Sequence, residues 1–162
     1  MAFFIGFFTI LVCWINHYHC FLHIVKCTPF LCIVNALVLF VVGFVSYPTD
    51  VLAEYITQPE SIIAVQFYDF TYILMASSYR ILWGYATKFN LLDPNTDQRF
   101  IKAVKQMYNL GIVHTILTFI ISFWCIPLAL IIYVLLFSIF MIPSIYIRFI
   151  LKHSKQRTPK PM

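Results

Sequence analysis

The stretch QMYNLGIVHTILTFIISFWCIPLALIIYVLLFSIFMIPSIYI, residues 106–147, runs for 42 residues without a formally charged side chain. One helix of that length would extend about 63 Å, roughly twice the 30 Å hydrocarbon core of a bilayer. The stretch therefore predicts two membrane-spanning helices joined by a turn. We expect the turn at residues 122–127, where an aromatic pair precedes a helix-breaking proline.

The composition of the whole chain excludes an ordinary soluble protein. Of its residues 62% are hydrophobic and only 10% are charged, whereas about a quarter of a soluble domain is charged. A chain of this size cannot bury so much apolar surface in one core, so lipid must cover the remainder. The five cysteines lie in or beside apolar runs, and we interpret them as small apolar residues rather than as a disulfide framework.

Two further stretches without a formal charge, residues 1–25 and 27–49, lie N-terminal to the stretch 106–147. Thr28 followed by Pro29 is typical of a helix start. We expect loops over residues 47–60 and 91–98, with Asn95 or Thr96 as the cap of the helix that follows. The predicted fold is an all-α, polytopic membrane bundle of about five transmembrane helices. The helices are expected at residues 2–25, 28–46, 61–88, 97–122 and 127–151, followed by a basic tail at 152–162.

The charges are divided between the two ends of this predicted bundle. All eleven Lys and Arg residues fall at one end, whereas the loop over 47–60 holds Asp50, Glu54 and Glu60 and no basic residue. Basic residues mark the cytoplasmic side, so we expect a cytoplasmic C-terminus. An odd number of helices then places residue 1 on the opposite side, and we expect that a first helix is missing through truncation or loss.

Asp69 lies within the predicted helix 61–88 and is the main polar candidate for function. An acidic residue at membrane depth is costly and usually faces a cavity, a pore or a partner. Asp69 is therefore a candidate for a water-facing or ion-facing residue. The alternative is that it lies close enough to the outer interface to be solvated.

The sequence offers little support for metal binding, catalysis or nucleic-acid binding. His19 and His23 share a helical face and are weak metal candidates, with Cys20 or Cys27 nearby; the alternative is a polar turn that packs against a neighbouring helix. The chain lacks paired carboxylates at helical spacing, a nucleophile elbow and a glycine-rich phosphate loop. We therefore expect neither an enzyme nor a nucleic-acid-binding protein, and no cofactor or structural metal.

Four short motifs follow one another along the chain: WINHYHCF (14–21), YPTDVLAEY (47–55), LWGYA (82–86) and SFW (122–124). They resemble the W-x-N-H-H-x-x-F, F-P-T-x-L-L-G-E-Y, L-W-R-Y-A and S-x-W motifs of the transmembrane protein 175 family of potassium channels, in its single-unit prokaryotic form. The resemblance extends to about Ile147. Gly84 replaces the arginine of the third motif, and the R-F-S-D signature of the family's first, pore-lining helix does not occur in this sequence.

The resemblance implies a six-helix unit of which this chain supplies helices two to six, and a homo-oligomer, most simply a tetramer. It implies passive K⁺ transport through an apolar constriction. Trp14, Asn16 and His17 would support the first helix. An outer-loop motif would comprise Pro48, Thr49, Glu54 and Tyr55.

Three functions remain open at this point. The first is a potassium-selective channel subunit, complete or truncated, in a prokaryotic cell (inner) membrane or a eukaryotic endosomal or lysosomal membrane. The second is a non-conducting membrane scaffold or interaction protein that keeps the family fold without the pore helix. The third is an intramembrane metal-dependent enzyme that uses the histidines and Asp69.

Overall fold

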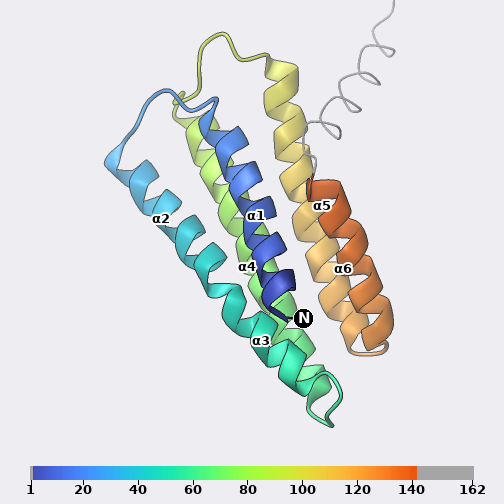
Figure 1. Ribbon diagram of the computed structural model, residues 1–162. Helices are drawn as coiled ribbons and strands as arrows, with labels where there is room; N and C mark the ends of the chain where they lie inside the picture. The colour runs from blue at the N-terminus through green and yellow to red at the C-terminus, as the bar shows by residue number, and fades with distance from the viewer. Residues whose placement is uncertain (1, 142–162) are drawn as a thin grey trace, which may run out of the picture.

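A computed structural model describes residues 2–141 as a bundle of helices (Figure 1). The all-α fold class is thereby confirmed. The helices are α1 (Ala2–Phe21), α2 (Pro29–Phe44), α3 (Ser46–Tyr55), α4 (Ser61–Lys88), α5 (Gln98–Ser122) and α6 (Ile126–Met141). The predicted continuation of the last helix to residue 151, and the basic tail at 152–162, lie outside the described residues.

Helix α4 is the central element of the bundle. It packs against α2, α3 and α5, while α1 lies in front of it and contacts α3 and α6 (Figure 1). The α1–α2 and α4–α5 connections lie at one end, and the α3–α4 and α5–α6 connections lie at the other. At the first end the backbone N–H groups of Val25 and Lys26 donate to the carbonyl of Leu91, which fastens the two connections together.

The prediction of a loop over residues 47–60 is wrong for most of that range, because Ser46–Tyr55 forms α3. Val45, between α2 and α3, keeps helical backbone angles (φ −54°, ψ −32°), so the chain bends there without leaving the helical region. Pro48 lies in the first turn of α3, where a backbone N–H has no helical partner to lose. The Thr49 hydroxyl donates to the Val45 carbonyl at 2.8 Å and so bridges the bend.

Local capping residues set the other helix ends. The Thr28 side chain accepts from the Leu31 N–H at 3.1 Å and caps α2, as its sequence predicts. Asp97, rather than Asn95 or Thr96, caps α5 by accepting from the Arg99 N–H at 2.8 Å. Asn90 ends α4 in the left-handed conformation at φ 52°, a role for which asparagine is well suited.

The outer surface of the bundle is strongly apolar. On α2 an exposed stripe at helical spacing comprises Phe30, Ile33, Leu37, Phe40 and Phe44. Among the described helices, the continuous segment 29–55 has the length and the mean hydropathy, 2.4, of a membrane span. Contiguous apolar surface of this extent is rare on a soluble monomer, which agrees with a bundle surrounded by lipid.

Candidate functional site among the buried polar residues

Asp69 is enclosed by its own subunit. Its side chain, on α4, has 0% exposed surface, so the alternative of a solvated carboxyl group at the outer interface does not fit this fold. The hydroxyl groups of Ser122 on α5 and Tyr133 on α6 lie near it. Nevertheless, no described residue forms a hydrogen bond with either carboxylate oxygen. The Ser122 hydroxyl donates instead to the Phe119 carbonyl at 2.7 Å.

Three tyrosines beside Asp69 form a second part of this polar region. Tyr68 and Tyr72 on α4 pack their rings against Tyr133 on α6, with centroids 5.5 and 5.2 Å apart. The Tyr68 and Tyr72 hydroxyls lie 2.9 Å apart, and the Thr9 hydroxyl of α1 lies 3.1 Å from that of Tyr72. A line of hydroxyl groups therefore joins α1 to α4, while the Tyr133 hydroxyl has no hydrogen-bond partner among the described residues.

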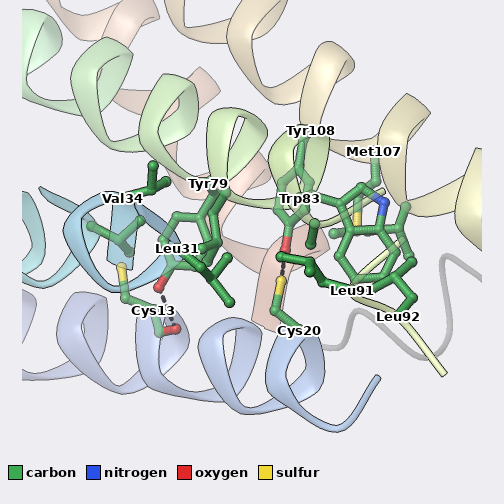
Figure 2. Packing of buried hydrophobic residues seen from close by; sticks show 14 of the residues in the cluster. Cys13, Cys20, Leu31, Val34, Tyr79, Trp83, Leu91, Leu92, Met107 and Tyr108 are labelled. Atoms are coloured by element: carbon green, nitrogen blue, oxygen red, sulfur yellow. Dashed lines mark hydrogen bonds between the residues drawn. The ribbon is translucent and has the colours of Figure 1, made fainter. Parts of the chain in front are cut away.

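Two more tyrosines hold α1 against α4 and α5 (Figure 2). The Tyr79 hydroxyl donates to the Cys13 carbonyl at 2.7 Å, and the Tyr108 hydroxyl lies 2.9 Å from the Cys20 sulfur. The two tyrosine rings stack with their centroids 5.9 Å apart. Cys13 and Cys20 are buried among these rings, in agreement with their interpretation as small apolar residues.

The end of α1 separates into an inner and an outer face. Asn16 is buried and its side chain donates to the Val12 carbonyl at 2.8 Å. The His17 ring nitrogen lies 2.7 Å from the Asn35 side-chain oxygen and so ties α1 to α2. Trp14 is 56% exposed and meets His17 edge-on at 5.6 Å. Of the three residues expected to form a supporting shell, Trp14 therefore lies on the outer surface.

Comparison with known proteins identifies the bundle. No family model matches the sequence. A potassium channel of Streptomyces collinus is 32% identical over 131 residues, which cover 80% of this chain and 64% of that protein. A potassium channel of Chamaesiphon minutus is 32% identical over 124 residues, which cover 76% of this chain and 61% of that protein.

A solved structure shares the fold. The crystal structure of a lysosomal potassium-selective channel TMEM175 homologue from Chamaesiphon minutus superposes with a TM-score of 0.78 at 27% identity, covering 88% of this chain and 72% of that one. The chain belongs to the TMEM175 family. It spans less than two thirds of the length of the two curated relatives that it matches. Its family is one of integral membrane channels and not of enzymes.

The outer-loop motif of this TMEM175 homologue lies on α3 and not in a loop. Pro48 and Thr49 are buried against the bundle. Glu54 is exposed near the acidic end, and its backbone carbonyl accepts from the Gln58 side chain at 3.1 Å. Tyr55 is partly buried at the last residue of α3. The buried members of the motif thus support the bend between α2 and α3, while the acidic member faces outward.

The third motif shows how the chain accommodates its departure from the family pattern. Trp83 is 1% exposed and donates from its indole nitrogen to the Ile101 carbonyl at 3.3 Å. A Cβ atom at Gly84 would lie 2.6 Å from the Arg80 guanidinium, so Arg80 occupies the space beside this glycine. Arg80 also donates to the Asn109 side chain at 2.7 Å, which joins α4 to α5.

The metal candidates of the TMEM175 homologue do not converge. Within residues 2–141, no three His, Cys, Asp or Glu side chains are arranged to hold a metal ion. The His23 ring packs on Phe100 with centroids 4.4 Å apart. Partial burial and then repulsion from His19 lower the pKa of His23, although Asp93 opposes this shift. The contact of the His23 ring with Phe100 on α5 is the kind of packing that the alternative of a polar turn against a neighbouring helix describes.

The sequence did not reveal the tyrosine contacts that join α1 to α4, either beside Asp69 or farther along the helix. Thr9 and Tyr72 are 63 residues apart, and Tyr79 is 66 residues from Cys13. Tyrosine is amphipathic and common in membrane helices, so its presence alone gives no signal. One indication was available, since Tyr68, Tyr72 and Tyr79 recur at i, i+4 and i+11 on one face of α4.

Proposed function

We propose that this chain is a subunit of a potassium-selective channel that carries K⁺ passively across a membrane. The observation that supports this most directly is the 32% identity to two potassium channels over most of the chain. The fold shared with a potassium-selective TMEM175 homologue, at a TM-score of 0.78, supports it independently. Flux of K⁺ and Na⁺ through the purified chain in liposomes tests the proposal, and a chain without flux would be a membrane scaffold instead.

We propose that the basic end of the bundle lies in the cytoplasm, together with the C-terminus. Lys26 lies in the connection that is bonded to Leu91, and Lys88 and Arg99 flank the neighbouring connection. The acidic residues lie at the opposite end, in and after α3. This separation follows the charge bias of membrane proteins. In intact cells, a membrane-impermeant thiol reagent should label no more thiols in Asn95→Cys than in the original chain, and additional labelling would contradict the proposal.

We further propose that the subunit forms a homo-oligomer, a tetramer by likeness to its family. An exposed face of α1 supports this, because Phe7, Leu11, Trp14 and Tyr18 recur there at helical spacing. Aromatic residues are enriched at the contacts between proteins. Native mass spectrometry of the detergent-solubilised chain would count the subunits, and a monomer would contradict the proposal.

Asp69 is proposed to contribute to conduction from within the subunit. Its side chain is enclosed, so it would not touch the ions that pass. In a medium of low dielectric constant, a charged carboxylate acts electrostatically over several ångströms. Asp69 could therefore influence a passing ion without direct contact. An intramembrane acid without a hydrogen-bonding partner among the described residues is costly, which favours a functional reason for its presence.

Glu54→Gln should leave the selectivity for K⁺ over Na⁺ unchanged and alter the conductance only modestly. Glu54 is exposed on α3, at the acidic end, where water and salt screen its charge. Single-channel recording under bi-ionic conditions would measure both quantities. Asp50→Asn is the matched control, because Asp50 is also an exposed acid on α3. A reversed preference for Na⁺ would show that Glu54 lies on the ion path.

A further inference from the structure

Two cysteines at the α1–α2 connection lie unusually close together. The sulfur atoms of Cys27 and Cys32 are 3.3 Å apart, and both side chains are exposed. A disulfide bond is about 2.05 Å long, so the two sulfurs need approach by only about 1.3 Å. The other described cysteines differ, since Cys13 and Cys20 are buried and Cys125 lies at the far end of the bundle.

The cap of α2 holds this pair in place. Cys27 precedes the capping residue Thr28, and Cys32 lies in the first turn of α2. The Thr28 side chain accepts from the Leu31 N–H at 3.1 Å, and its carbonyl accepts from the Cys32 N–H at 3.1 Å. These two bonds fix the backbone on both sides of the sulfurs. The two sulfurs lie 3.3 Å apart on this capped turn, before any bond between them is formed.

We propose that Cys27 and Cys32 form a dithiol site that is modified by small-molecule disulfides and closes into an internal disulfide. One thiolate attacks the reagent and forms a mixed disulfide, which releases one small thiol. The second thiolate then attacks the protein sulfur and releases the other small thiol. The two cysteines are oxidised by two electrons, the reagent is reduced to two thiols, and the two cysteine protons pass to solvent or to the leaving thiolates.

Formation of the Cys27–Cys32 disulfide would affect the place where the α1–α2 and α4–α5 connections contact each other. The same connection carries Val25 and Lys26, whose N–H groups bond the α4–α5 connection at Leu91. Thr28 also lies 3.4 Å from the Tyr85 hydroxyl on α4. An internal disulfide would stiffen the point where the two connections meet. If the basic end is cytoplasmic, as proposed above, the reduced pair is the resting form, and oxidation there is transient.

The pair should react faster in alkaline solution. The hydrogen bond to Cys32 raises the pKa of the Cys27 thiol, because the second sulfur opposes a charge on the first. The thiolate is the reactive form, so its fraction and the exchange rate increase with pH. Incubation with oxidised glutathione at about pH 8.5 is therefore the appropriate condition.

Mass spectrometry of the full-length protein in detergent, after treatment with oxidised glutathione and then a maleimide, tests the proposal. Cys27 and Cys32 are expected to lose two hydrogens together and to carry neither glutathione nor maleimide. After reduction and a second maleimide treatment, each of the two should carry one maleimide. Cys125 is the matched control, because it is exposed and has no described partner sulfur, and it should retain glutathione.

The single variants Cys27→Ser and Cys32→Ser make the test specific. In each variant the remaining cysteine of the pair should retain glutathione, because no second thiol is present to displace it. Persistent glutathione on both Cys27 and Cys32 in the original sequence would overturn the proposal. A disulfide formed only between two chains would overturn it equally. Neither outcome depends on ion conduction, so the proposed function is tested separately.

Discussion

Trp83→Ala should lower the free energy of unfolding by about 3–5 kcal/mol, the usual cost of removing a large aromatic side chain from a packed core. Trp83 is 1% exposed, and its ring meets Phe100 with centroids 6.3 Å apart. The change also leaves the Ile101 carbonyl without its indole donor. For a chain of this size we expect a melting temperature lower by on the order of 10 °C in detergent. Thermal unfolding followed by size-exclusion chromatography measures it.

Trp124→Ala is the matched control for this prediction. Trp124 is 80% exposed in the turn between α5 and α6, so the same atoms are removed without opening a cavity. The melting temperature should change much less than in Trp83→Ala. Equal losses in the two variants would contradict the described packing around Trp83.

Asp69→Ala should raise the free energy of unfolding, by about 1–3 kcal/mol, which is the usual cost of a buried polar group without a hydrogen bond. No described residue forms a hydrogen bond with the carboxylate, so the substitution breaks none there. Alanine also favours the helix more than aspartate does. The same variant should conduct K⁺ more slowly, if Asp69 contributes to conduction as proposed. Thermal unfolding and liposome flux measure the two effects.

Thr71→Ala is the control for Asp69→Ala and should act in the opposite direction. Thr71 is equally buried on α4, but its hydroxyl donates to the Phe67 carbonyl at 3.0 Å. Its removal should lower stability by about 1 kcal/mol, the net value of a typical hydrogen bond. A large loss of stability in Asp69→Ala would contradict the prediction, because it would reveal a stabilising partner of the carboxyl group.

Helix positions were predictable because membrane spans have a strong chemical signature. Long stretches without charge, such as residues 106–147, can satisfy their backbone in lipid only as helices. The helical turn at Tyr47-Pro48 was missed, because proline and threonine after an apolar run are as typical of a loop as of a new helix. Only the packing of Thr49 and Pro48 against the bundle distinguishes the two.

The environment of Asp69 could not be predicted from the sequence. Alternation of polar and apolar residues orients a helix in water, but a membrane helix is apolar on both its lipid side and its packed side. The rotation of α4 is therefore set by contacts with distant residues, such as the one between Tyr72 and Thr9. The inward position of His17, bonded to Asn35, depends on tertiary packing in the same way.

Flux of K⁺ and of Na⁺ through the purified chain in liposomes, driven by equal gradients, tests the proposed channel function most directly. We expect K⁺ to leave vesicles that contain the protein faster than it leaves empty vesicles, and Na⁺ to leave them much more slowly than K⁺. Equal K⁺ leakage from protein-containing and empty vesicles, with the helical fold verified in the same preparation, would contradict it. The chain would then be a non-conducting scaffold with the fold of a TMEM175 channel.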